Sequence, residues 1–172
     1  MFNADGLVQK GNIAEMVVYS FLLSQDHITN VVDVTKNREY QDVEIDFTFD
    51  VGSLLYGVEV KYDKHIGNTK NVIFELTRIH LTSQNHCAYL GWSVFSEADY
   101  IAVWCEPTQE LYMIQTVKLR KAFQRYATAA KKSMQLRTII SDDTRLTINV
   151  LIPLSYVRYR KFIIEGGHWN EA

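Results

Sequence analysis

Apolar residues in the first third of the chain recur first with helical spacing and then with strand spacing. From Leu7 to Ser24 they return every three or four positions, which predicts a helix. A short strand is expected at 31–34, and apolar and polar residues alternate at 43–49 and again at 54–62. Because the turn-forming segment 50–53 separates the two alternating runs, they predict a β-hairpin.

Further β-rich runs follow, with one helical pattern among them. Strands are expected at 72–76, 100–104, 111–114 and 146–152, and a helix at 116–130. The predicted fold class is therefore α/β, with a central mixed β-sheet flanked by helices. Because no repeat or linker divides the chain, we expect a single domain over residues 1–172.

Composition and charge limit the function. With 47% hydrophobic residues the chain can bury a substantial core, and its net charge of -2 is not that of a protein that coats nucleic acid through bulk positive charge. Cys87 and Cys105 form no paired motif, and the histidines lack the spacing of a zinc enzyme. We expect no membrane-spanning segment, and the absence of a secretory signal predicts a cytoplasmic protein.

The predicted hairpin carries two acidic residues and a lysine. Alternate side chains of a strand share a face, so Glu59 and Lys61 point the same way, and strand pairing brings Asp46 next to Glu59. Two adjacent carboxylates repel each other unless a cation lies between them, and Mg²⁺ accepts carboxylate oxygens while keeping waters. Lys61 would hold or deprotonate the attacking water, or stabilise charge on a phosphate. The alternative is a solvent-facing strand with ordinary charged residues.

Glu15 adds a carboxylate from the first predicted helix, where it interrupts a mostly apolar stripe. A buried acid needs a partner. A metal site shared with Asp46 and Glu59 would provide that partner, and a salt bridge from the helix to a lysine would also do so.

Together, Glu15, Asp46 and the triplet Glu59-Val60-Lys61 resemble the acidic core of the PD-(D/E)XK nuclease superfamily. Residues 6–105 are also similar to a group of bacteriophage-type endonucleases in that superfamily. The chain departs from the family label at Ile45, which stands where the label has proline. Because the carboxylate performs the chemistry, this departure weighs little.

The resemblance implies a restriction-endonuclease-like αβββαβ core at 6–105, with a C-terminal helix and strand within 106–172. It implies a Mg²⁺-dependent endodeoxyribonuclease that would accept Mn²⁺ as a substitute, acting in the host cytoplasm if it is phage-encoded. The implied catalytic residues are Glu15, Asp46, Glu59 and Lys61. The implied metal ligands are Asp46, Glu59, Glu15 and the backbone carbonyl of Val60, and the implied supporting residues are Gln41, Asn71, Glu75 and Ser96.

Two groups of basic residues are expected to contact DNA phosphates. One follows the active strand and the other lies on or beside the predicted helix 116–130; they are Lys64, Lys70 and Arg78, and Lys121, Arg125 and Lys132. For each group, ordinary surface charge is the alternative.

The sequence leaves the substrate open. It contains no recognisable sequence-reading module, which favours selectivity for DNA structure, such as branched DNA or Holliday junctions. A non-catalytic nucleic-acid-binding protein that keeps the nuclease fold and an RNA-directed nuclease are the alternatives. Cleavage of both strands of a duplex would call for a homodimer.

Overall fold

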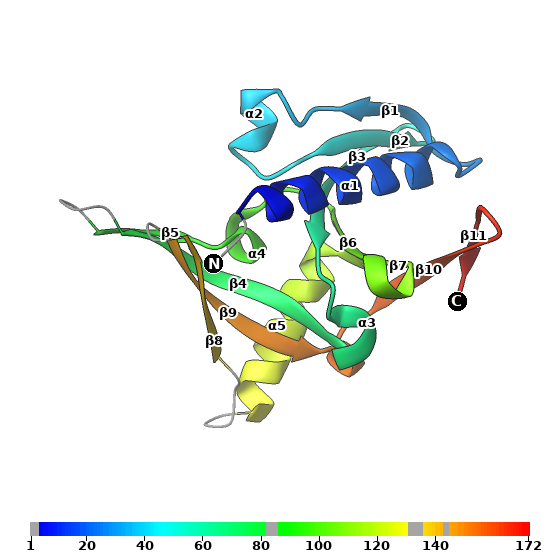
Figure 1. Cartoon of the computed structure of the whole chain (residues 1–172). Helices are drawn as coiled ribbons and strands as arrows, with labels where there is room; N and C mark the ends of the chain where they lie inside the picture. The colour runs from blue at the N-terminus through cyan, green and yellow to red at the C-terminus, as the bar shows by residue number, and fades with distance from the viewer. Residues whose placement is uncertain (1–3, 82–85, 131–135, 143–144) are drawn as a thin grey trace.

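The computed structural model describes residues 4–81, 86–130, 136–142 and 145–172, whose strands form two β-sheets (Figure 1). Sheet A has the order β1-β2-β3-β6-β7-β10-β11 and sheet B the order β5-β4-β9-β8. The strands of sheet A are β1 (Thr29–Asp33), β2 (Phe47–Val51), β3 (Leu54–Tyr62), β6 (Tyr100–Cys105), β7 (Glu110–Gln115), β10 (Tyr159–Glu165) and β11 (His168–Glu171). Those of sheet B are β4 (Asn71–Leu81), β5 (His86–Leu90), β8 (Leu136–Asp142) and β9 (Arg145–Pro153).

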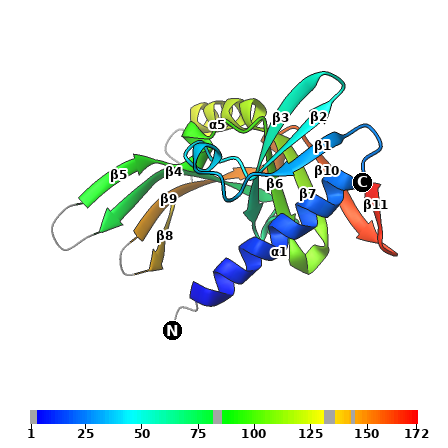
Figure 2. The same ribbon diagram turned by 90° about the horizontal axis from the view of Figure 1, so that it is seen from above.

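Two long helices lie on different sides of sheet A. Helix α1 crosses one face, and α5 lies on the other side, where it contacts β7 of sheet A and β9 of sheet B (Figure 2). The helices are α1 (Ala4–Leu23), α2 (Arg38–Gln41), α3 (Ile66–Thr69), α4 (Trp92–Phe95) and α5 (Thr116–Ala130), with 3-10 turns η1 (Glu106–Thr108) and η3 (Leu154–Tyr156). Within the described ranges, no helix has both the length and the apolar character needed to cross a membrane.

The α/β fold class expected from the sequence is confirmed. Elements α1, β1, β2, β3, α4 and β6 follow in the order αβββαβ, with α2 within this run and α3, β4 and β5 inserted between β3 and α4. Strands β1, β2 and β3 are antiparallel neighbours, and β6 joins β3 in parallel. The parallel register places Glu59 opposite Ile101 and Lys61 opposite Val103.

One predicted strand begins later than expected. The hairpin is present and β3 has the predicted bounds, but β2 starts at Phe47 and not at residue 43. Glu44 has a positive φ of 55°, which is incompatible with a regular strand. The Glu97 N–H donates to the Val43 carbonyl, and the Ser96 hydroxyl donates to the Glu44 carbonyl. These contacts hold residues 43 and 44 against the loop after α4. The alternation of apolar residues at 43–46 therefore does not produce a strand there.

Hydrophobic clusters cover both faces of sheet A and set the direction of the β3 side chains. Val58 and Val60 are buried in the cluster beneath α1. Because neighbouring side chains of a strand point to opposite faces, Glu59 and Lys61 face away from α1 and toward sheet B.

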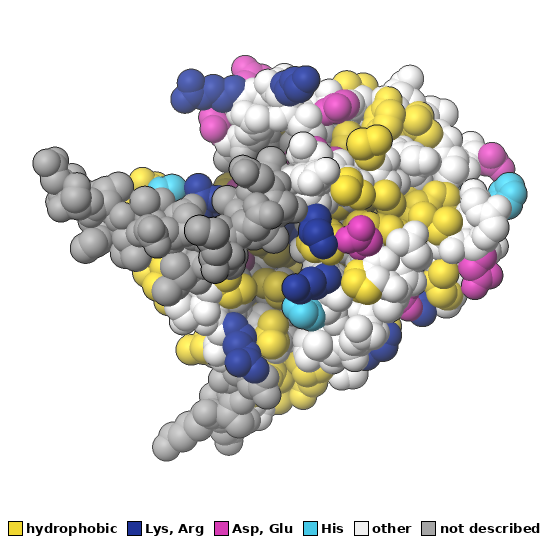
Figure 3. All heavy atoms as spheres, in the orientation of Figure 1, with side chains coloured by type: hydrophobic (Ala, Val, Ile, Leu, Met, Phe, Trp, Pro, Cys, Tyr) yellow, Lys and Arg dark blue, Asp and Glu magenta, His cyan; other side chains and the backbone are white. Residues whose placement is uncertain are grey.

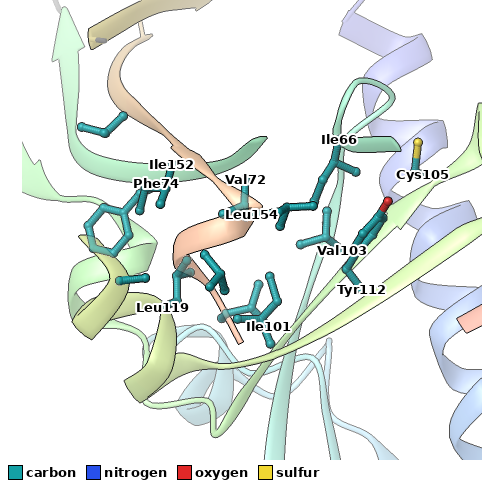
Figure 4. Close-up of a cluster of buried hydrophobic side chains, with 14 of the residues drawn as sticks. Ile66, Val72, Phe74, Ile101, Val103, Cys105, Tyr112, Leu119, Ile152 and Leu154 are labelled. Carbon is teal, nitrogen blue, oxygen red and sulfur yellow. The ribbon is translucent and has the colours of Figure 1, made fainter. Parts of the chain in front are cut away.

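The second cluster joins sheet A to sheet B and α5. In it Ile101 of β6, Phe74 of β4 and Leu119 of α5 are buried together (Figure 4). The Phe74 ring also stacks on Phe123 of α5, with centroids 4.4 Å apart. Burying each such side chain stabilises the fold by roughly 1.5–3 kcal/mol, so this cluster fixes the position of sheet B relative to Glu59 and Lys61.

Candidate active site

A cleft between sheet A and sheet B receives the polar face of β3. It has a volume of about 160 Å³ and is lined by residues of both sheets and of α4, among them Lys61, Glu75, Asn149 and Trp92. A second cavity of about 400 Å³ adjoins it, because Asn149 lines both. In the space-filling view, Lys and Arg side chains and one His lie beside the hollow where the two sheets meet (Figure 3).

Asp46 lies beside Glu59 through backbone pairing with β3. The Asp46 N–H donates to the Val58 carbonyl at 2.9 Å, and the Val60 N–H donates to Asp46 Oδ2 at 2.7 Å. Burial raises the pKa of Asp46, although the Val60 N–H and the Lys61 ammonium oppose this rise. The hairpin thus brings the two predicted carboxylates together just before the first residue of β2.

Glu59 lies deepest in the group, with 3% of its surface exposed. Burial raises the pKa of Glu59 well above its usual range; Lys61 opposes this, while the Asp46 and Glu44 carboxylates add to it. The site therefore favours a proton or another cation at Glu59, because bare negative charge is unfavourable there.

The Lys61 ammonium lies among these carboxylates. It contacts Glu59, lies 3.4 Å from Glu44 Oε2, and is 5.1 Å from the centroid of the Trp92 ring. Burial alone would lower the pKa of Lys61, but the Glu59 and Glu44 carboxylates outweigh burial and raise it. Lys61 is therefore a fixed positive charge at neutral pH.

Glu15 of α1 lies near this group but on the α1 side. It is half-buried; burial raises its pKa first, and the Asp46 and Asp33 carboxylates add to the rise, while Lys61 opposes it. Glu15 is therefore close enough to Asp46 and Lys61 to sense their charges. Its role as a metal ligand stays a prediction.

Glu44 joins Lys61 to sheet B, although it was not among the site residues predicted from the sequence. Besides its contact with Lys61, Glu44 Oε1 lies 3.6 Å from Arg78 Nη2, which in turn lies 3.1 Å from Glu75 Oε1. Lys61 and Arg78 lower the pKa of Glu44 despite its burial. The positive φ at Glu44 is a strained conformation for a residue with a side chain. Glu44 also stands two residues before Asp46, the spacing of one strand face, which was an available signal.

Glu75 and the start of α4 are held in close contact. The buried Ser93 hydroxyl accepts the Glu75 N–H at 2.9 Å, and the Trp92 N–H approaches Glu75 Oε1 at 3.4 Å. A Cβ added at Gly91 would lie 2.2 Å from the Glu75 carbonyl oxygen, so only glycine permits this approach. The contact places the Trp92 ring beside Lys61. The sequence assigned no role to Trp92 or Ser93, because their roles depend on the pairing of distant strands.

The other predicted supporting residues lie in different surroundings. Ser96 supports the strained backbone at Glu44, as described above. Asn71 lines the adjoining cavity and donates to the Thr69 carbonyl at 3.0 Å. Gln41 is exposed on α2 and donates to the Thr35 carbonyl at 2.5 Å, which ties it to its own loop. Its contribution to the site stays a prediction.

The predicted DNA-contacting residues fall into exposed residues and one residue that is held inside the site. Lys64 and Lys70 are exposed on either side of α3, next to residues that line the 400 Å³ cavity. Arg78 is held by Glu44 and Glu75 inside the site. Lys121 and Arg125 are exposed on α5, and Lys132 lies outside the described residues.

The donor chemistry of the site fits a hard divalent cation. Asp46 and Glu59 offer carboxylate oxygens, and their raised pKa values show that negative charge there lacks compensation. Among the described residues, no three His, Cys, Asp or Glu side chains are arranged to hold a metal ion. Two protein carboxylates are nevertheless sufficient for Mg²⁺, which commonly takes one or two carboxylates and completes its shell with water and substrate phosphate.

Comparisons with known proteins add one structural likeness. No protein-family model matches the chain, and no curated protein matches it. Among solved structures, it is similar to the bacterial homing endonuclease I-Ssp6803I, with a TM-score of 0.49 and 20% sequence identity over 65% of this chain and 71% of that chain. A likeness of this size carries no conclusion about activity, which must be argued from the site itself.

Proposed function

We propose that the protein is a metal-dependent DNA endonuclease of the PD-(D/E)XK type. The observation that supports this proposal is the proximity of Asp46, Glu59 and the charged Lys61, of which Lys61 lines the cleft between the two sheets. Two carboxylates that favour a cation, beside a fixed ammonium, are suited to hydrolysis of a phosphodiester. The bacteriophage-type grouping and a cytoplasmic location stay predictions.

Asp46 and Glu59 would hold the ion with the Val60 carbonyl, and Glu15 would contribute from α1. Mg²⁺ bound there would activate a water molecule and neutralise charge on the phosphate, and Mn²⁺ would substitute for it. Lys61 contributes a positive charge for a non-bridging phosphate oxygen and a donor that orients the attacking water. It does not act as the base, because the carboxylates around it keep its pKa raised.

We assign the flanking DNA to the exposed cations on two sides of the cleft. Lys64 and Lys70 would contact phosphates at α3, and Lys121, Arg125 and Lys132 would contact them on and after α5. Arg78 would reach a phosphate only by leaving Glu44 and Glu75. Branched DNA is the preferred substrate in this proposal, and cutting of both strands requires a homodimer.

Cleavage assays test the proposal directly. Supercoiled, linear, single-stranded and branched DNA would each be incubated with the protein in Mg²⁺, in Mn²⁺ and in excess chelator. We expect cutting with either metal and none in chelator, and loss of cutting by Asp46→Asn, which is nearly isosteric. Undiminished cutting in chelator, or by Asp46→Asn, would refute the metal site.

A non-catalytic nucleic-acid-binding protein is the second candidate, and the contact of Lys61 with Glu59 favours it, because this ion pair already neutralises part of the site. DNA binding without cleavage of any substrate in either metal would establish this alternative. A parallel RNA series separates an RNA-directed nuclease from a DNA nuclease.

A further inference from the structure

Four cationic side chains gather at a pocket on the outer side of α5. The pocket has a volume of about 200 Å³, and its lining consists of Lys118, Lys121, Arg125 and Arg158. None of them lines either of the cavities beside Lys61 and Asn149. The pocket is therefore separate from the candidate active site.

Among the described residues, no acidic side chain balances the charge of this pocket. Six cations elsewhere in the described ranges pair with Asp or Glu, and they are Lys10, Arg38, Lys61, Arg78, Arg160 and Lys161. None of the four pocket residues forms an ion pair with a described acidic side chain. Gathering like charges is unfavourable, and in a chain of net charge -2 it does not follow from a general excess of basic residues.

Specific contacts bring the four side chains together from two parts of the chain. Lys118, Lys121 and Arg125 lie three and four residues apart, which places them on one face of α5. Arg125 Nη2 donates to the Tyr156 carbonyl at 2.5 Å, and the Tyr126 and Tyr156 rings meet edge to face at 5.2 Å. These contacts hold η3 against α5 and so deliver Arg158, two residues further on, to the pocket.

We propose that this pocket binds a single phosphate group of the DNA backbone, away from the phosphodiester that is cut. Guanidinium and ammonium groups are the usual partners of phosphate oxygens, and their convergence from two elements defines one position for the anion. The pocket would fix the orientation of the DNA on the protein, since phosphate contacts position a duplex without reading its sequence. The choice of DNA as the source of the phosphate rests on the proposed function.

The salt dependence of DNA binding tests for a single phosphate. Affinity of the full chain for a labelled duplex would be measured against salt, with Ca²⁺ in place of Mg²⁺, for Lys121→Gln, Arg158→Gln and the double variant. Each neutralised phosphate contributes roughly 0.9 to the log-log slope. Because both residues serve the same phosphate, we expect the double variant to lose no more than about 0.9. Lys36→Gln, an exposed change on the loop between β1 and α2, is the control and should leave the slope unchanged.

A loss of about 1.8 in the double variant would mean two independent contacts and would overturn the single-phosphate site. Inorganic phosphate provides a second arm, followed by backbone amide NMR signals of α5. One possible result is that inorganic phosphate causes saturable NMR shifts that disappear in the double variant, while the salt slope of DNA binding is unchanged. This result would support the anion site but would identify its ligand as free phosphate. No shift and no change of slope would overturn it. If the chain neither binds nor cuts DNA, the proposed function fails, and the phosphate titration still decides whether the pocket exists.

Discussion

The cleft and the α5 pocket concentrate charge in opposite ways. In the cleft, positive and negative groups alternate: Lys61 lies between Glu59 and Glu44, and Arg78 lies between Glu44 and Glu75. In the pocket, four cations share one small volume, and none of them pairs with an acidic side chain of the described residues. The group around Lys61 carries more acidic than basic side chains and favours a cation, whereas the pocket depends on an anion from outside.

This difference suits the cleft to a role in the proposed reaction and the pocket to a role in binding DNA. Lys61 is held by the Glu59 and Glu44 carboxylates and lies over the Trp92 ring, so for the proposed reaction its charge is preorganised. The surface cations need no such precision, since a phosphate contact tolerates adjustment of long side chains. Changes in the cleft should therefore affect rate, and changes in the pocket should affect affinity.

The largest effect is expected from Lys61→Met. The variant keeps much of the chain length but loses the charge, so single-turnover cleavage should fall by at least about a hundredfold, the scale of a lost charge-stabilising group. Affinity for DNA and Mg²⁺ should stay within a few-fold, since Lys61 is no metal ligand. Equal losses of binding and rate would show that Lys61 only holds the substrate, and the division between cleft and pocket would fail.

A smaller effect on rate is expected from Glu44→Gln, which removes one of the two acids that position Lys61. We expect kcat to fall about tenfold with KM unchanged, which corresponds to about 1.4 kcal/mol of lost transition-state stabilisation. Glu44→Gly relieves the positive φ and serves as the matched variant. The same fall in kcat in a protein whose thermal stability is not reduced would assign the effect to the carboxylate. A normal kcat in both variants would remove Glu44 from the site.

Asp46→Asn should stabilise the metal-free protein, because the raised pKa of Asp46 marks a carboxylate that folding disfavours. The unfolded chain releases this proton near pH 3.8, and the folded chain holds it to higher pH, so folding is penalised as pH rises through that interval. For each 1 kcal/mol of penalty removed, Tm should rise by about 2–4 °C. The gain should be present at neutral pH in chelator and vanish as pH falls toward 3.8. Thermal scans of both proteins at several pH values would measure this gain. A gain in Tm that is the same at every pH would show that it does not come from the Asp46 carboxylate.

Much of the fold and part of the site could be predicted from sequence, for local reasons. Helix α5 and strand β3 have the predicted bounds because their apolar periodicity is unbroken. The same period of two gave the shared face of Glu59 and Lys61. The start of β2 was wrong because the backbone at Glu44 is held by Ser96, 52 residues away.

The missed parts of the site depend on such distant contacts. Sheet B pairs β4 with β9, which lie far apart in the chain, so the second wall of the cleft was not predicted. The position of Trp92 depends on that wall, because Trp92 is held by Glu75 of β4. Likewise the pocket requires Arg158 to meet Arg125 across 33 positions, through the Tyr156 carbonyl. A pattern of neighbouring residues contains no information on either approach.

The smallest expected effect is on thermal stability, which should rise on loss of a pocket cation and fall on loss of Lys61. Lys121→Gln removes a charge that lies among three others, with Lys118 and Arg125 at helical neighbour spacing. Like-charge pairs at that spacing destabilise a helix by about 0.2–0.5 kcal/mol each, so without DNA the variant should melt about 1–2 °C higher than the parent. High salt screens exposed charges, and the difference should disappear near 1 M salt, where the screening length is about 3 Å.

Lys61→Met should change stability in the opposite direction, because it leaves Glu59 and Glu44 without their shared partner. Parallel thermal scans of the two variants at low and high salt would check both signs, and a lower Tm for Lys121→Gln at low salt would show that the pocket cations already have a stabilising partner within the chain.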